Sequence, residues 1–188
     1  MNLRIHPLTS DRWHDFVSLF GPRGACGGCW CQYWRRSHAV FERNKGSGNR
    51  AAMRRLVKRG VRPGLIAYQG RQPVGWCSLG PRTQFTRLKT ARILKPVDNR
   101  PVWSVVCLFV ARDYRRRGVS AQLIRGAVEY AGEQGAETLE GYPHDPTVAK
   151  KRWPDPFVWT GLYSSYAKAG FREVARRSPS RPVMRCEL

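Results

Sequence analysis

The run Arg115-Arg116-Arg117-Gly118-Val119-Ser120 is the stretch whose residue types and spacing point most directly to chemistry. It joins a continuous apolar segment, residues 102–110, to residues 118–134, in which apolar side chains recur at helical spacing. The first N–H groups of a helix have no partner within it and carry partial positive charge, so they attract anions. Gly118 lets the backbone approach a ligand closely, and the arginines supply cations for phosphate. The run therefore predicts a phosphate site, although the GxxxxGK[ST] and GxGxxG patterns of common nucleotide sites are absent.

Two segments resemble motifs of the GNAT N-acetyltransferase superfamily. Arg115 and Gly118 match its coenzyme A motif [QR]-x-x-G-x-[GA], with Ser120 where Gly or Ala is usual. The stretch Tyr166-Ala167-Lys168-Ala169-Gly170-Phe171 resembles the family's late Tyr-x-x-x-Gly-Phe element. Seven residues before that tyrosine the family often has Asn, but this chain has Trp159, so that cofactor contact is not carried over. The resemblance covers residues 60–188, and residues 1–60 fit the family's variable first strand and two helices.

The resemblance implies a mixed, mostly antiparallel sheet flanked by helices and a site for acetyl-CoA between two parallel strands that diverge. Those strands are here residues 102–110 and 138–142. Backbone groups of Leu108, Phe109 and Val110 would pair with the pantetheine arm, and one N–H there would polarise the thioester carbonyl. The backbone amides of Arg116 to Ser120, which include Gly118 and Val119, would hold the pyrophosphate. The side chains of Arg115, Arg116 and Arg117 would add positive charge beside it. The implied activity is acetyl transfer from acetyl-CoA to a primary amine, by direct attack in a ternary complex.

Two residues are candidates for the proton transfers of that reaction. Glu140 ends its predicted strand just before the Gly141-Tyr142-Pro143 break, which makes it the candidate base; alternatively it orients substrate or pairs with an arginine. Tyr166 is the candidate acid for the departing thiolate, with Tyr163 as a substitute, or else it is packed in the core. Cys107 as an acylated nucleophile is disfavoured, because no histidine is adjacent in sequence and the family usually transfers the acetyl group directly.

The six cysteines leave a metal site open but incomplete. Cys26-x-x-Cys29-x-Cys31 resembles half of a zinc site that His14 or His38 could extend, but a second cysteine pair is missing, so we expect no metal. We expect residues 24–34 instead to form a Gly-rich loop lining the acceptor pocket. Its aromatic residues, Trp30, Tyr33 and Trp34, would contact a flat or apolar substrate or pack in the core. Cys77 and Cys107 lie in apolar strand-like runs and are expected to be buried.

The order of elements predicts one mixed α/β domain, with 1–60 as the acceptor-side region and 61–188 as the cofactor-binding core. Strands are expected at residues 3–5, 64–68, 74–79, 102–110, 138–142, 171–174 and 182–186. Helices are expected at residues 13–20 behind a Thr9-Ser10-Asp11 cap, and at 49–59, 118–134 and 161–169. Residues 21–31, 80–100 and 143–158 are predicted to be loops.

The net charge of +21, from 34 basic and 13 acidic residues in a chain of 188, is strongly uneven. Residues 1–94 carry 18 basic and only 3 acidic side chains. This field favours an anionic acceptor, or one that is part of a larger particle, and it supports an alternative function as a nucleic-acid- or ribosome-associated binding module. No apolar run suits a membrane span or a signal peptide, so we expect a soluble cytoplasmic protein without membrane contact. The resemblance also allows a homodimer.

Overall fold

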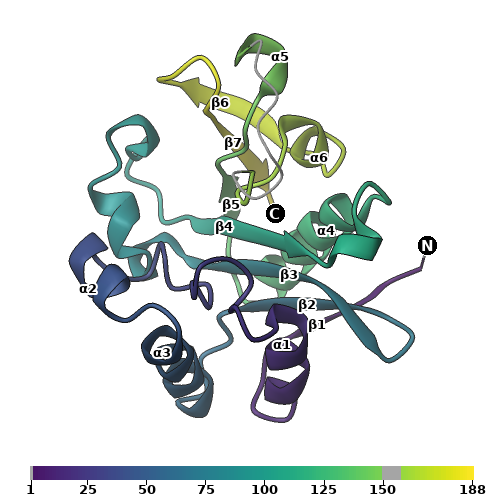
Figure 1. Ribbon diagram of the computed structural model, residues 1–188. Helices are drawn as coiled ribbons and strands as arrows, with labels where there is room; N and C mark the ends of the chain where they lie inside the picture. The colour runs from purple at the N-terminus through teal and green to yellow at the C-terminus, as the bar shows by residue number, and fades with distance from the viewer. Residues whose placement is uncertain (1, 150–157) are drawn as a thin grey trace.

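The computed structural model describes residues 2–149 and 158–188 as a seven-stranded sheet flanked by helices (Figure 1). The strand order is β1-β2-β3-β4-β5-β7-β6, and each adjacent pair is antiparallel except β4 and β5. This confirms the mixed, mostly antiparallel sheet. The strands are β1 (Arg4–Pro7), β2 (Gly64–Gln69), β3 (Gln72–Pro81), β4 (Trp103–Val110), β5 (Thr138–Gly141), β6 (Arg172–Arg176) and β7 (Pro182–Glu187).

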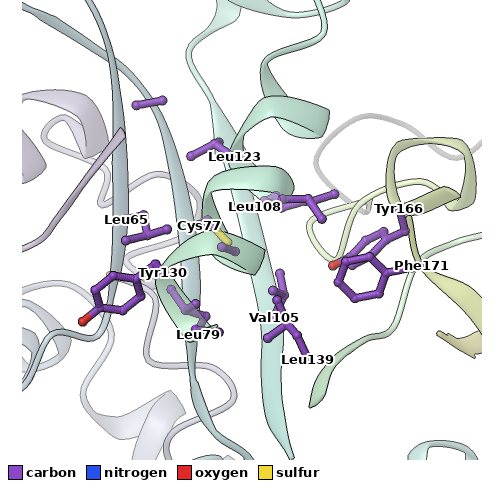
Figure 2. Close-up of a cluster of buried hydrophobic side chains, with 14 of the residues drawn as sticks. Leu65, Cys77, Leu79, Val105, Leu108, Leu123, Tyr130, Leu139, Tyr166 and Phe171 are labelled. Atoms are coloured by element: carbon purple, nitrogen blue, oxygen red, sulfur yellow. The ribbon is translucent and has the colours of Figure 1, made fainter. Parts of the chain in front are cut away.

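The helices cover both faces of the sheet. Side chains alternate between faces along a strand, and on β3 Cys77 belongs to the core cluster that includes α4, whereas Trp76 belongs to the cluster under α1 and α3. Figure 2 shows part of the first cluster, in which Tyr166 and Phe171 lie beside Leu108. The helices are α1 (Trp13–Phe20), α2 (His38–Arg43), α3 (Ser47–Lys58), α4 (Val119–Glu133), α5 (Pro146–Ala149) and α6 (Tyr163–Ala167).

The parallel pair β4 and β5 separates after a short contact. Their register joins Trp103 to Leu139, Ser104 to Glu140 and Val105 to Gly141, and β4 then continues without β5 through residues 106–110, where it stays paired with β3 on its other side. The ring of Tyr166 lies against the end of β5, since a Cβ on Gly141 would be 2.1 Å from its Cε1. The two strands therefore diverge at the place where the sequence predicts the acetyl-CoA site.

Several local expectations need correction. Helix α2 was not predicted, because its six residues are too few to show a clear apolar period. Helix α1 begins after Arg12 without a side-chain cap, because the hydroxyl of Thr9 donates to Asp11 instead. Residues 80–100 include 3-10 turns at Arg82–Gln84, Thr86–Lys89 and Arg92–Leu94. The expected loop at 143–158 begins with α5, and its residues 150–157 lie outside the described residues.

Candidate functional site

A cavity of about 760 Å³ opens where β4 leaves β5. It extends from the N-terminus of α4, along the free half of β4, to the Gly- and Cys-rich loop after α1 and to the chain that precedes α6. Its lining comprises Phe20, Arg23, Ala25, Cys26, Gly27, Cys31, Cys107, Leu108, Phe109, Val110, Tyr114, Arg115, Arg116, Gly118, Val119, Ser120, Ala121, Pro146, Val158, Trp159, Gly161, Leu162 and Ser165. The cavity thus has one strongly cationic end and mostly apolar walls.

The cationic end is the turn that the sequence singled out. Gly118 precedes α4 with a left-handed φ of 78°, and Arg116 also has a positive φ, of 61°. Alternating backbone conformations of this kind turn successive N–H groups to one side, which favours an anion. Arg115, Gly118 and Ser120 line the cavity here. Arg117 is the one predicted cofactor residue that does not; its guanidinium lies over the Tyr114 ring, 5.8 Å from the centroid.

The wall formed by β4 contains Leu108, Phe109 and Val110, as the sequence predicted. The Leu108 N–H is already used, because it donates to the carbonyl oxygen of Trp159 at 2.5 Å. The carbonyl oxygen of Val110 accepts a hydrogen bond from Arg115 Nε at 3.2 Å. An incoming thioester could use the Leu108 amide only by replacing the Trp159 carbonyl.

The Gly- and Cys-rich loop is held in an unusual backbone conformation. Ala25, Trp30 and Cys31 have φ values of 67°, 43° and 53°, in a region that residues with a Cβ seldom adopt. Gly28 is required there, since a Cβ would be 2.3 Å from the Gly46 nitrogen. Such strain persists only where the surrounding structure imposes it, and it clusters at functional sites. In the part of the chain that the structure describes, no three His, Cys, Asp or Glu side chains are grouped to hold a metal ion.

Glu140, the candidate base, lies away from the cavity. Its side chain is fully buried, its Oε1 is 2.9 Å from Arg82 Nη1, and its Oε2 is 2.9 Å from Arg185 Nε. The Tyr142 hydroxyl donates to Oε1 at 2.6 Å. The carboxylate is therefore enclosed by its own partners, and this arrangement favours the alternative in which Glu140 pairs with arginine.

Tyr166, the candidate acid, is also fully buried and is absent from the cavity lining. Its hydroxyl donates to the carbonyl oxygen of Thr160 at 3.0 Å, and its ring packs edge-on against Phe171. Burial raises the pKa of this phenol well above its usual value, so the group stays protonated. These contacts favour the alternative in which Tyr166 is packed in the core. Its ring still lies directly behind the cavity wall at Gly161. Tyr163 is half-buried against the same core cluster.

The aromatic residues after the cysteines pack inside the protein. Trp30 stacks on Phe20 with 5.8 Å between ring centroids, and Trp34 is buried in another cluster. Tyr33 contacts Trp159 edge-on and carries the Arg87 guanidinium at 3.8 Å. None of Trp30, Tyr33 and Trp34 is in the described lining of the cavity. Cys77 is buried as predicted, whereas Cys107 is half-buried and lines the cavity.

Comparison with known proteins agrees with this geometry. The model of the acetyltransferase (GNAT) family matches residues 30–150, more than half of the chain. The chain belongs to the GNAT family. It is accordingly an acyltransferase of the N-acetyltransferase class. The matched range includes residues 115–120, which the sequence predicts as a phosphate site, and ends before residues 166–171. The comparison with curated proteins found no match.

Solved GNAT structures share the fold at low sequence identity. The PaiA N-acetyltransferase of Thermoplasma acidophilum, solved with coenzyme A, aligns over 100% of both chains with 15% identity and a TM-score of 0.54. A putative arylalkylamine N-acetyltransferase of the mosquito Aedes aegypti aligns over 98% of this chain and 87% of its own, with 13% identity and a TM-score of 0.58. The aminoglycoside acetyltransferase AAC(6')-Ib, also with coenzyme A, aligns over 99% and 95%, with 16% identity and a TM-score of 0.54.

Two parts of the cavity lining were not predicted residue by residue. Phe20 and Arg23, at and just after the end of α1, line the cavity, but nothing in their spacing sets them apart from a helix end and a loop. Trp159 comes just after the loop expected at residues 143–158, and Gly161 and Leu162 begin the helix expected at 161–169, so the spacing of these residues did not mark them as part of the cavity. Both parts reach the cavity through contacts between segments distant in sequence.

Among the residues that the structure describes, no helix has the length and apolar character of a membrane span.

Proposed function

We propose that this protein transfers the acetyl group of acetyl-CoA to a primary amine, by direct attack of the amine within a ternary complex. One continuous cavity carries the proposal. It joins the cationic turn before α4 to the edge of β4 that β5 leaves and to the Gly- and Cys-rich loop after α1. Coenzyme A has the matching order of groups: phosphates, an extended pantetheine arm and a thiol. The residues present therefore suit this substrate along its length.

Each end of the cavity has its own task in the proposed reaction. Backbone amides at the start of α4, with Arg115 and Arg116, bind the phosphates. The apolar wall of β4 holds the pantetheine arm. The acceptor amine enters from the side of residues 1–60, past the Gly- and Cys-rich loop after α1. The excess of basic residues in that part of the chain favours an anionic acceptor. Its attack on the thioester carbon forms the amide and releases coenzyme A.

Calorimetric titration with acetyl-CoA of wild-type protein and of Gly118→Glu tests the cofactor site. We expect saturable binding that the variant loses, because the carboxylate repels the phosphates at the turn. Gly118→Ala is the matched control: both variants impose the same strain at φ 78°, and no atom lies within 4 Å of the added Cβ. Alanine should therefore keep most of the affinity.

The opposite results would remove the proposal. Unchanged affinity in Gly118→Glu would show that the phosphates bind elsewhere. If wild-type protein bound no acetyl-CoA but bound a short RNA in a salt-sensitive manner, the function would be that of the nucleic-acid-associated module.

A further inference from the structure

The proposed reaction needs a group that removes a proton from the acceptor's ammonium, and the cavity offers few. An amine attacks only after it has lost that proton, and a positioned base accelerates the step. Among the described residues that line the cavity, none is Asp, Glu or His. Apart from arginines and Tyr114, the titratable side chains there are Cys26, Cys31 and Cys107.

The sulfur of Cys31 accepts a hydrogen bond from a buried indole N–H. Trp76 on β3 is fully buried, and its Nε1 lies 3.2 Å from Cys31 Sγ. The side chains of Cys107 on β4 and Ser78 on β3 are also neighbours of this sulfur, and the Ser78 hydroxyl itself donates to the Pro63 carbonyl oxygen at 3.3 Å. A neutral thiol is a weak acceptor, so a buried N–H that donates to this sulfur stabilises the thiolate form more than the thiol. Cys31 is 5% exposed and lines the cavity, so the sulfur is shielded but reachable.

Arg35 supplies a positive charge that lacks a carboxylate. Its Nη1 donates to Gln84 Oε1 at 3.1 Å and its Nη2 to the Pro63 carbonyl at 3.0 Å, while its buried Nε has no hydrogen-bond partner. Within residues 2–149 and 158–188 no carboxylate forms a salt bridge with this guanidinium, and Cys31 is the titratable group whose charge, as a thiolate, would act on it. A cation withdrawn from water is costly unless an anion balances it. A negatively charged Cys31 provides that balance.

The backbone at Cys31 has an unusual conformation that packing holds in place. Trp30 and Cys31 are consecutive residues with left-handed φ values, and Trp30 is buried against Phe20 and Phe16. Packing of the indole therefore anchors the strained turn that presents Cys31 to β3 and β4.

We propose that Cys31, as a thiolate, is the general base of acetyl transfer, an inference that rests on the proposed function. The sulfur takes one proton from the acceptor's ammonium, so that an S–H bond forms as an N–H bond breaks. The freed lone pair attacks the thioester carbon, and the C–S bond of acetyl-CoA breaks once the C–N bond has formed. The second nitrogen proton goes to the sulfur of the departing coenzyme A, and the proton on Cys31 returns to solvent.

The charges around the sulfur agree with this role. The neighbouring Cys107, Trp76 and Ser78 side chains, with the charge of Arg35, lower the pKa of Cys31 to about 7 in spite of burial. The remaining titratable neighbours are thiols: burial raises the pKa of Cys29 to about 11, and the pKa values of Cys77 and Cys107 also rise. A base whose pKa lies near the working pH is suited to proton transfer at neutral pH.

Alkylation by iodoacetamide, followed by peptide mass spectrometry, tests the thiolate without any acetyl transfer. In wild-type protein we expect the rate at Cys31 to be half-maximal near about pH 7, the pKa at that site. Cys186 on β7 is the internal control and should need a more alkaline pH. Trp76→Phe removes one donor, so the midpoint for Cys31 should move to higher pH. A Cys31 that reacts only at the pH of an ordinary thiol, about 8.5, would overturn the proposal.

Steady-state kinetics with an amine found by screening then tests the base. We expect Cys31→Ala to lower kcat by about a hundredfold or more, as loss of a general base does, with acetyl-CoA affinity unchanged by calorimetry. In wild-type protein kcat/KM should fall as pH drops through about 7, because Cys31 becomes protonated, and Trp76→Phe should move that limb upward. Cys186→Ser, on a strand that does not line the cavity, should change neither value.

Two results would overturn the role of Cys31 while leaving the proposed function intact. One is full turnover in Cys31→Ala. The other is an acetyl group found covalently on Cys31 after incubation with acetyl-CoA alone, which would make the residue a nucleophile. If wild-type protein did not bind acetyl-CoA at all, the proposed function would be wrong. The pH dependence of alkylation would still show whether Cys31 is a thiolate.

Discussion

Glu140 holds two arginines together inside the protein. Its oxygens lie 2.9 Å from Arg82 Nη1 and 2.9 Å from Arg185 Nε, and the Arg185 side chain is almost as buried as the carboxylate. Removing one partner of a buried ion pair costs about 3–5 kcal/mol, because the other charge stays desolvated. We expect Glu140→Gln to lower the free energy of unfolding by that amount, measured by urea denaturation. Turnover per folded molecule should be preserved; a large loss of turnover at unchanged stability would make Glu140 the base after all.

Tyr166 offers a second residue-scale test that separates packing from catalysis. Its hydroxyl donates to the buried Thr160 carbonyl at 3.0 Å, and leaving a buried acceptor unpaired costs about 1–3 kcal/mol. We expect Tyr166→Phe to lose stability on that scale in thermal denaturation, with kcat and acetyl-CoA affinity maintained. Tyr163→Phe, on the same helix and half-buried, is the control and should change little. If kcat fell in Tyr166→Phe without a change in stability, the hydroxyl would be acting as the acid.

At the scale of elements, the packing of the Tyr166 ring from α6 against β5 depends on a glycine at the end of β5. A Cβ on Gly141 would be 2.1 Å from Tyr166 Cε1, and that ring is held against Phe171. We expect Gly141→Ala to cost at least about 1–3 kcal/mol, as overpacking does, in chemical denaturation. Gly132→Ala is the matched control, since nothing lies within 4 Å of its added Cβ in α4 and alanine favours a helix.

A double-mutant cycle shows whether the contact itself is responsible. Combining Gly141→Ala with Tyr166→Leu removes the ring that the new methyl would strike, so the two costs should be less than additive. Strict additivity would mean that Gly141 is needed for its backbone and not for the space it leaves to Tyr166.

At the scale of the whole molecule, the charge of +21 should act on the phosphates of the cofactor. Raising the salt from about 0.1 M to about 1 M shortens the screening length from about 10 Å to about 3 Å. We therefore expect the Kd of acetyl-CoA to rise with salt in calorimetry. The Kd of acetyl-pantetheine, which lacks the phosphates, is the control and should be nearly constant. A salt-independent Kd for acetyl-CoA would show that the excess charge serves another purpose.

The sequence by itself determined what depends on neighbouring residues. The apolar run of β4, the arginines, Gly118 and the amphipathic α4 lie within one stretch of about thirty residues, so the conformation of this turn and its place beside the cavity could be predicted. Hydrophobic periodicity placed most strands and helices for the same reason. Arg117 was predicted with the turn, but the direction of one exposed side chain is not a property of the sequence pattern, and it lies over Tyr114.

Only the tertiary structure decided which distant residues meet. Glu140 on β5 faces Arg185 because β5 pairs with β7, which follows it by about forty residues, and Arg82 reaches the same carboxylate from the segment after β3. These contacts, which no local pattern shows, place the candidate base in a buried ion pair. Cys31 meets Trp76 and Cys107 in the same way, from a loop, β3 and β4. A local pattern reports the conformation of its own segment, whereas the environment of a buried charge or thiol depends on contacts between segments far apart in the chain.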